Sequence, residues 1–459
     1  MIFNSYAFLL GFLPLAWITY VAAARDERLR LPVLFVISLV FYGWWNPLHV
    51  PLLLASILVN WIAALTFARS GRRAIIVAAV VLNLGVLALF KYLVFFNQIA
   101  ADTTGHAFDL PALALPLGIS FFTFHHIMYL SDLGAGKTGT FPLTHYALYI
   151  GFFPQVLSGP LVRYNEVMHQ WARPPFGEGA AERIGRGLIF IVLGLVEKVL
   201  LGDPVASVVN PIYARAVELA GSAGSLGLAE AWTAAFGFGL QIYFDFAGYS
   251  HIAVGVGLLF GIMLPQNFNA PYRAASIREF WRRWHMTLSR FLRDYLYIPL
   301  GGNRHGLALQ LAALIVTMTL AGLWHGAGWP FVVWGLLHGL ALSIDVLWRR
   351  AGFTMPTVLG WVLTLLFVMF AWPLFRAPSF AAALPIFHGL SGFGALGAIP
   401  NLAPLALGGA VALLAPTTWS LATRLRPSPV LGAILAVLLL VVLVRIGDGE
   451  NYEFIYFRF

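Results

Sequence analysis

Two histidines stand out among the residues that could do chemistry. His325 lies in the stretch GLWHGAGWP (322–330), inside a segment that is otherwise as apolar as lipid. An ionisable side chain in such a segment is costly and usually faces a polar cavity, and an imidazole with a pKa near ~6.5 can accept a proton from a hydroxyl at neutral pH. The flanking Gly322, Gly326 and Gly328 allow a ligand or a second helix to approach. His325 is therefore a candidate general base; a hydrogen-bonded packing histidine is the alternative.

The second histidine, His285, belongs to the basic stretch SIREFWRRWHMTLSRFLRDYLYIPLGGNR (276–304). Ser276 and Glu279 form a capping box, after which apolar residues recur with helical period and arginines occupy the other side. The pattern predicts one amphipathic helix over 276–298, lying flat at the cytoplasmic interface. On a helical wheel His285 falls at the border of the two faces. The segment is either a plain interfacial anchor or a site where arginines attract an anionic cytosolic ligand past His285.

Other polar groups interrupt apolar runs at membrane depth, among them Asp245, Tyr249, Asn267 and Trp324. Each alone could be a structural hydrogen-bonding group, but together they predict a polar path through the helices. Trp324, Tyr249 and Asn267 are also candidates to stabilise an oxyanion. No HExxH-like spacing predicts a metal site, and no GxSxG elbow or P-loop predicts a serine hydrolase or an NTPase.

Composition identifies the solvent in which these residues work. Of 459 residues, 60% are hydrophobic and only 10% charged, against about 25% charged in soluble domains. The apolar runs are too long for barrel strands, so an all-α polytopic membrane protein is expected. The net charge of +9 comes from short clusters between the runs, a topology signal and not a nucleic-acid site. With no cysteine, disulfides and thiol chemistry are excluded.

The runs predict about 11–12 transmembrane helices in a single domain, 1–459, with the N-terminus outside and a first span in place of a cleaved signal peptide. Residues 307–348 should form a helical hairpin that carries His325 at its turn. The run 231–264 is expected to be one broken or tilted element, because Asp245, Gly248 and Tyr249 interrupt it. Residues 144–162 hold Pro154 and Pro160 and should form a re-entrant or interfacial piece.

Several motifs together resemble the membrane-bound O-acyltransferase (MBOAT) family: QIYFDFAGYSHIAVGVGLLFG, FWRRWHMTLSRFLRDYLYIPLGGNR and GLWHGAGWPFVVWGLLHG, with FPQVLSGPLVRY mid-chain and FIYFRF at the end. The resemblance is to the bacterial branch of alginate O-acetyltransferases and of the teichoic acid D-alanyl transfer protein. It implies a ring of helices around a central funnel and tunnel, with His325 and His285 as the two marker histidines.

The resemblance also implies a reaction. His325 would activate a hydroxyl for attack on a thioester, and His285 would orient the donor. Arg282, Arg283, Trp284 and Arg304 would bind the donor, acetyl-CoA or an acyl carrier protein on the cytosolic side, and no cofactor would be held permanently. The acceptor would be an extracytoplasmic polysaccharide, reached across a bacterial inner membrane through an SGNH-type partner protein. D-alanyl transfer, a proton-coupled transporter and a catalytically silent scaffold are the alternatives.

Overall fold

The computed structural model describes residues 1–106, 108–110, 113–157, 159–222, 224–392, 395–448 and 454–455. Within these ranges the regular elements are all helices, which confirms the predicted all-α class. The chain forms two compact units, each of them discontinuous in sequence. Unit 1 comprises Met1–Ile191, Tyr249–Pro265 and Arg426–Ala433; unit 2 comprises Val192–Gly248, Gln266–Leu425 and Ile434–Phe459.

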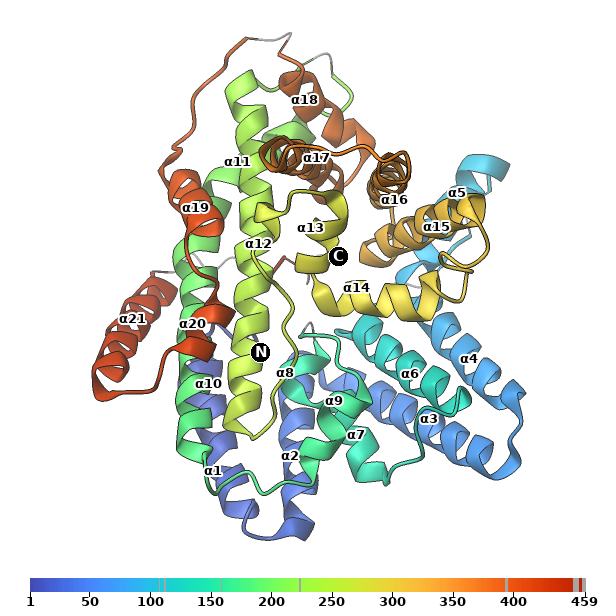
Figure 1. Ribbon diagram of the computed structural model, residues 1–459, viewed down its shortest axis with the longest axis vertical. Helices are drawn as coiled ribbons and strands as arrows, with labels where there is room; N and C mark the ends of the chain where they lie inside the picture. The colour runs from blue at the N-terminus through green and yellow to red at the C-terminus, as the bar shows by residue number, and fades with distance from the viewer. Residues whose placement is uncertain are drawn as a thin grey trace. The chain divides into compact units, whose positions relative to one another are not determined.

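Unit 1 is built from the N-terminal helices (Figure 1). Polar contacts join its helices where apolar runs alone would leave their register undefined: Asn60 and Asn83 exchange hydrogen bonds of 2.6 and 3.2 Å between α3 and α4. Its elements are η1 (Ala7–Phe12), α1 (Leu13–Ala23), α2 (Glu27–Gly43), η2 (Pro47–His49), α3 (Val50–Ser70), α4 (Arg73–Lys91), α5 (Leu93–Thr104), α6 (Ile119–Gly134), α7 (Leu143–Gly151), α8 (Phe153–Val156), α9 (Tyr164–Trp171) and most of α10 (Ala180–Leu195).

Unit 2 carries both marker histidines and most of the C-terminal half of the chain. Its elements are η3 (Val196–Gly202), α11 (Asp203–Glu218), most of α12 (Leu228–Leu259), η4 (Pro271–Arg273), α13 (Ile277–Arg283), α14 (Met286–Leu292), η5 (Arg293–Tyr297), α15 (Leu307–His325), α16 (Trp329–Arg350), α17 (Thr357–Arg376), α18 (Phe380–Leu390), α19 (Ala403–Leu414), α20 (Thr418–Arg424) and most of α21 (Pro429–Gly447).

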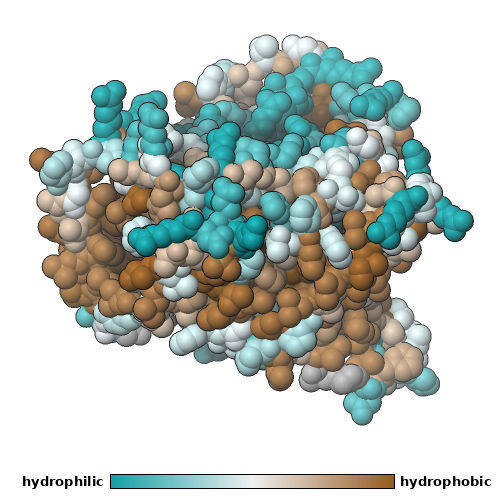
Figure 2. All heavy atoms as spheres, turned by 90° about the horizontal axis from the view of Figure 1, so that it is seen from below, coloured by the Kyte–Doolittle hydropathy of each residue, from teal (hydrophilic) through white to brown (hydrophobic). Residues whose placement is uncertain are grey.

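Seven of the described helices are long and apolar enough to cross a membrane, or eight if the bent pair α19 and α20 forms one span. The 11–12 crossings predicted from the sequence exceed this number because several apolar segments fold into shorter helices: α2 has 17 residues and α6 has 16. Many large apolar side chains are exposed on α3, α4 and α21. On the face drawn in Figure 2, apolar residues form a broad expanse bordered by hydrophilic ones, as expected for a surface in contact with lipid.

The structure shows how the two interrupted apolar segments, 231–264 and 144–162, fold. Residues 228–259 form one unbroken helix, α12, so the predicted single element is confirmed but the predicted break at Asp245 is absent. The helix continues because Asp245 is buried with charged and backbone partners and does not compete for the helical hydrogen bonds. Residues 144–162 form the short, buried helices α7 and α8 and no full-length span, in agreement with a re-entrant or interfacial piece.

The predicted hairpin is confirmed by α15 and α16, which pack against each other along their length (Figure 1). Glycines set the close approach of the two backbones. A Cβ at Gly322 would overlap with the carbonyl oxygen of Phe331, and a Cβ at Gly335 with that of Met318. At Gly339 a Cβ would lie 2.8 Å from Cα of Ile315. Small residues thus let two membrane helices approach to backbone contact.

Candidate active site

His325 is the last residue of α15, at the turn of the hairpin. It is buried, with 4% of its surface exposed. Its ring lies edge-on to three aromatic rings, with centroid distances of 4.8 Å to Trp324, 5.5 Å to Trp334 and 5.0 Å to Phe375. The hairpin turn therefore places the imidazole in an aromatic, water-poor setting inside unit 2.

His285 does not lie on the predicted continuous helix. The segment breaks into α13, α14 and η5, and His285 occupies the break with a φ of 41°. A positive φ is costly for a residue with a Cβ and stops helix propagation, so the helical wheel misplaced this side chain. His285 therefore does not lie at the border between a polar and an apolar face; it is fully buried, with 0% of its surface exposed.

Hydrogen bonds fix the tautomer of His285. Its Nδ1 lies 3.0 Å from Oδ1 of Asn267, an oxygen that also accepts from the backbone N–H of Thr287 at 3.3 Å and from Oγ1 of Thr287 at 2.9 Å. Because that oxygen can only accept, Nδ1 donates and Nε2 carries the lone pair. Burial lowers the pKa of His285 to about 3. The ring is therefore neutral near pH 7 and presents Nε2 as an acceptor.

An aromatic series connects the two marker histidines within unit 2. Trp284, next to His285 in sequence, lies 5.0 Å from Trp372 between ring centroids. Trp372 lies 5.5 Å from Phe375, which is 5.0 Å from His325. The two histidines, 40 positions apart in sequence, thus border one aromatic cluster.

A cavity of about 610 Å³ opens beside α13, α14 and the hairpin, within unit 2. Four arginines line it: Arg278, Arg282, Arg290 and Arg293. Trp281, Met286, Thr317, Met318, Leu342 and Val346 are among its other lining residues. Arg278 also forms a 2.7 Å ion pair with Asp345. A cavity lined by arginines and by apolar side chains suits an elongated ligand with an anionic end.

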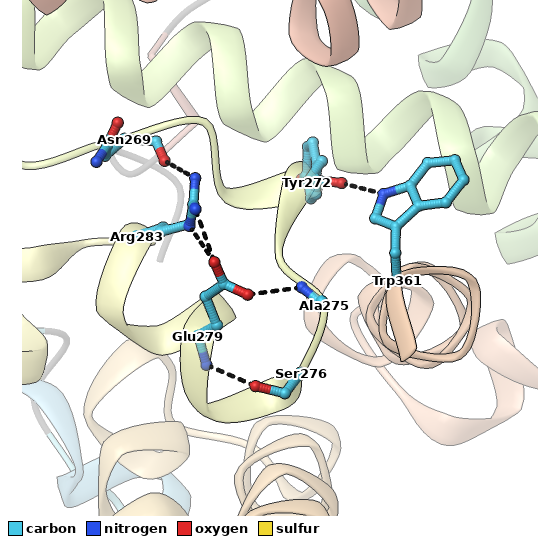
Figure 3. A network of polar contacts seen from close by, with 7 residues as sticks. All are labelled: Asn269, Tyr272, Ala275, Ser276, Glu279, Arg283 and Trp361. Atoms are coloured by element: carbon cyan, nitrogen blue, oxygen red, sulfur yellow. Dashed lines mark hydrogen bonds and ion pairs between the residues drawn. The ribbon is translucent and has the colours of Figure 1, made fainter. Parts of the chain in front are cut away.

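The four predicted donor-binding residues have different surroundings. Arg282 lines the cavity. Arg283 is instead held by Glu279 near the predicted capping box, of which the structure confirms one half: Ser276 Oγ accepts from the N–H of Glu279. The Glu279 carboxylate accepts from the N–H of Ala275, one residue before the cap, at 2.8 Å and from Arg283 at 2.6 Å (Figure 3). Trp284 is buried in the aromatic cluster, and Arg304 is exposed and is not among the lining residues.

Figure 3 also shows how this cap is attached to the neighbouring chain. Arg283 donates to the carbonyl oxygen of Asn269, and the indole of Trp361 on α17 donates to the carbonyl oxygen of Tyr272 at 2.8 Å. The start of α13 is therefore fixed from both sides. That rigidity determines where Trp281 and Arg282, one turn further on, meet the cavity.

The four residues predicted to form the polar path have different surroundings. Trp324 contacts His325 and Asn267 holds His285, as described above. Asp245 is buried in an ion pair of 2.5 Å with Lys198, and its other oxygen accepts from the N–H of Ile455 at 2.7 Å. Tyr249 belongs to unit 1, where it stacks on Phe3 at 4.5 Å. Of the three that belong to unit 2, Trp324 and Asn267 contact the marker histidines.

Sequence reasoning missed a third buried histidine of the same cluster. His338, on α16, lies 4.6 Å from Trp334 and 5.2 Å from Trp281 between ring centroids. The signal was the spacing in WGLLHG, which places Trp334 and His338 on one helix face. Among the described residues, no group of three or more His, Asp or Glu side chains gathers as metal ligands would.

Comparison with known proteins shows which family the chain resembles. The chain is 37% identical over 428 residues to the peptidoglycan O-acetyltransferase of Helicobacter pylori, covering 85% of this chain and 80% of that protein. It is 37% identical over 407 residues to the probable alginate O-acetylase AlgI of Pseudomonas aeruginosa, covering 86% and 75%. The teichoic acid D-alanyltransferase of Streptococcus thermophilus is 30% identical over 246 residues, or 51% of this chain and 57% of that one.

The family model of the membrane-bound O-acyltransferases matches residues 80–382, a range that contains both marker histidines, the hairpin and the arginine-lined cavity. The resemblance read from the sequence motifs is thereby confirmed. This chain is a multi-pass membrane protein and an acyltransferase, and it belongs to the membrane-bound O-acyltransferase family.

Proposed function

We propose that this enzyme moves an acetyl group from cytosolic acetyl-CoA to hydroxyl groups of an extracytoplasmic polysaccharide at a bacterial inner membrane. The observation that carries the proposal is that one cluster of aromatic residues in unit 2 lies between a basic cavity and His325. The relatives that match over most of the chain are named for O-acetylation of peptidoglycan and alginate, both of them polysaccharides.

The cavity supports a phosphate-bearing donor. Guanidinium groups bind phosphate oxygens through two parallel N–H donors and stay charged at any physiological pH. Arg282 and Arg290 would hold the phosphates of coenzyme A, because Arg278 and Arg293 are paired with Asp345 and Asp294. The apolar wall formed by Met318, Leu342 and Val346 would accommodate the thinner arm that ends in the thioester. No permanently bound cofactor is needed for this reaction.

The chemistry assigned to His325 is general base catalysis. Its imidazole takes the proton of the acceptor hydroxyl as the oxygen attacks the thioester carbonyl carbon, forming a C–O bond. The tetrahedral intermediate then expels the sulfur, the C–S bond breaks, and the thiolate recovers the proton from the imidazolium. The products are an acetyl ester and free coenzyme A. Such proton transfer contributes about 10²–10⁴-fold to a rate.

His285 would have a different role, because its lowered pKa makes it a weak base near pH 7. Its Nδ1 is engaged by Asn267, so Nε2 is the atom that would meet a ligand. A neutral Nε2 lone pair accepts a hydrogen bond, for example from an amide N–H of the donor's arm. His285 thus orients the donor, and His325 performs the proton transfer.

The polysaccharide would be reached through an SGNH-type partner protein outside the membrane. The alternative is D-alanyl transfer from a carrier protein, which the teichoic acid D-alanyltransferase relatives favour by name but match over only about half of this chain. A carrier protein also presents a phosphopantetheine arm, so the arginine-lined cavity alone does not choose between the donors. The identity over 85–86% of the chain favours acetyl transfer.

The proposal is tested with inverted membrane vesicles from the bacterium that encodes the chain, supplied with [14C]acetyl-CoA. We expect label in the polysaccharide fraction and stoichiometric release of coenzyme A. His325→Ala should lower both by about 100-fold or more, whereas His388→Ala, an exposed histidine of α18, should not. Consumption of a D-alanyl carrier protein but not of acetyl-CoA would establish the alternative. A normal rate in His325→Ala would overturn the role of His325.

A further inference from the structure

The buried histidines of this chain fall into two kinds. In unit 1, both ring nitrogens of His125 and His126 are satisfied within the protein: His125 binds the carbonyl oxygen of Phe121 and the N–H of Val162, and His126 binds Ser56 and Tyr146. These are structural histidines. His338 differs, because it is fully buried yet its Nε2 has no hydrogen-bond partner among the described residues.

The other nitrogen of His338 fixes its protonation. The indole N–H of Trp281 donates to Nδ1 of His338 at 3.3 Å. An indole nitrogen can only donate, so Nδ1 holds the lone pair and the proton of the neutral ring lies on Nε2. A buried N–H without a partner costs about 1–3 kcal/mol. Such a cost is commonly offset when a ligand supplies the missing acceptor.

The position of His338 relates that N–H to the cavity. Leu342 and Val346, which follow His338 at four-residue intervals on the same face of α16, both line the cavity, and so does its partner Trp281. On α15 the cavity wall includes Thr317 and Met318. The close contact of Gly339 with Ile315 and Met318 puts His338 at this same level of the hairpin.

His325 lies beyond this level of the hairpin. The ring of Trp334 is 4.6 Å from His338 and 5.5 Å from His325, so a single indole separates the two imidazoles. A donor that enters among the arginines and reaches His325 would have to pass the level of Thr317 and His338. Thr317 Oγ1 is likewise buried without a hydrogen-bond partner among the described residues. Thr317 lines the cavity, whereas His338 is not a lining residue and adjoins the cavity through Trp281, so two buried polar atoms lie at one level of the hairpin.

We propose that His338 is a third working histidine, whose Nε2–H donates a hydrogen bond to a carbonyl oxygen of the thioester donor on the path from the arginine-lined cavity to His325. The inference rests on the proposed function, since it assumes a donor that enters by this cavity. It assigns to His338 a part in binding the donor and none in proton transfer, because Trp281 holds the ring in one neutral tautomer.

The test compares three substitutions by equilibrium binding of acetyl-CoA and of coenzyme A to the detergent-solubilised full chain, together with steady-state kinetics. His338→Leu removes the Nε2–H group that would donate the hydrogen bond. His338→Gln places an amide N–H near the position of Nε2, and His338→Asn places its amide near Nδ1, where it can meet only Trp281. Folding is followed by the thermal midpoint of each variant.

We expect His338→Leu and His338→Asn to weaken acetyl-CoA binding about tenfold, or about 1.4 kcal/mol, and His338→Gln to restore it, with KM for the acceptor unchanged in all three. If coenzyme A loses the same factor, the carbonyl belongs to the donor's arm; if only acetyl-CoA does, it is the acetyl carbonyl.

Equal losses in Gln and Asn variants of normal thermal midpoint would overturn the assignment, because only the Nε2 position should matter. Unchanged acetyl-CoA binding in a folded His338→Leu protein would also overturn the assignment. The proposed function would remain supported in that case, provided that the wild-type protein is active. Wild-type protein that neither binds nor consumes acetyl-CoA would instead refute the proposed function. If His338→Leu does not fold, the Gln and Asn pair decides the question.

Discussion

The Nδ1 atom of His285 lies 3.0 Å from the amide oxygen of Asn267, a residue 18 positions earlier in the chain. That oxygen accepts from Thr287 as well, so one buried amide fixes both the ring of His285 and the start of α14. The connection explains how a histidine with a positive φ keeps one orientation. The backbone break orients the side chain, and Asn267 determines which nitrogen keeps its lone pair.

Asn267→Leu should therefore impair the role of His285 although residue 285 itself is unchanged. We expect a loss of about 1–3 kcal/mol in the free energy of unfolding, because buried N–H and O–H donors lose their acceptor, and a fall in donor affinity comparable to that of His285→Ala. The double variant should be no worse than either single one, since the two residues act as a unit. Additive losses in donor binding would show that Asn267 acts independently of His285.

The charge state of His285 predicts a pH dependence of stability. Its folded-state pKa is lowered to about 3 by burial, whereas an unfolded histidine titrates near ~6.5. Below ~6.5 the unfolded chain binds a proton that the folded chain does not, so stability falls as the pH drops through this window by at most about 1.4 kcal/mol per pH unit. Thermal midpoints between pH 7.5 and 5 should fall less steeply in His285→Gln; parallel curves would contradict the assignment.

Placing an acid next to His285 should create a titration that the wild type lacks. In Asn267→Asp a carboxylate lies beside Nδ1, which favours the imidazolium and raises the pKa of His285. Protonation would occupy Nε2 and remove the acceptor offered to the donor. We expect acetyl-CoA affinity to decrease as the pH falls from 8 to 6 in this variant but not in the wild type, measured by equilibrium binding. An identical pH profile for the two proteins would exclude this role of Nε2.

The glycines of the hairpin give a test of its packing. Gly335→Ala introduces a Cβ that meets the carbonyl oxygen of Met318 on the neighbouring helix, so the backbones must separate. Overpacking of this kind costs about 1–3 kcal/mol and should lower the thermal midpoint and the activity together. Gly328→Ala is the matched control, because its Cβ would meet only ordinary contacts, 3.7 Å from Pro330 and 3.8 Å from Phe331. Equal effects of the two substitutions would refute the packing argument.

How much of this could be predicted from sequence depends on the range of the interaction. The helical class, the hairpin around His325 and the N-cap at Ser276 follow from local patterns, and the structure confirms them. The break at His285 could not be predicted, because the pattern from 276 to 298 is helical and a long-range bond to Asn267 competes with it. The same holds for Asp245, whose partners lie 47 and 210 positions away. His338 escaped notice because its function depends on Trp281, 57 positions away.

The arginines of the cavity predict a salt-dependent donor affinity. Arg282→Gln should raise KM for acetyl-CoA several-fold at low ionic strength and flatten its dependence on salt, because one charge that attracts phosphate is lost. Arg283→Gln should have a smaller effect on KM, since that guanidinium is engaged by Glu279 and Asn269. The control Arg424→Gln changes an exposed arginine outside the cavity. Should all three shift KM equally, a general surface charge and not the cavity would attract the donor.

The buried charges around Lys198 hold the backbone of Ile455 in place. Lys198 pairs with Asp203 at 2.7 Å and with Asp245 at 2.5 Å, and Asp245 accepts the N–H of Ile455 with its second oxygen. Asp245→Asn should destabilise the protein by about 3–5 kcal/mol, because a buried cation loses one of its two counter-charges. Phe454 adjoins Phe246, whose ring lies 4.7 Å from that of His285, so release of the segment should reach the active site.

Hydrogen exchange followed by mass spectrometry measures that release directly. We expect peptides containing Phe454 and Ile455 to exchange faster in Asp245→Asn, together with a weaker binding of acetyl-CoA. Asp448→Asn is the matched control, because its ion pair with Arg445 is exposed and such pairs contribute about 0–1 kcal/mol. Unchanged exchange at Ile455 in a folded Asp245→Asn protein would show that the segment is fixed by the packing of Phe454 and not by this carboxylate.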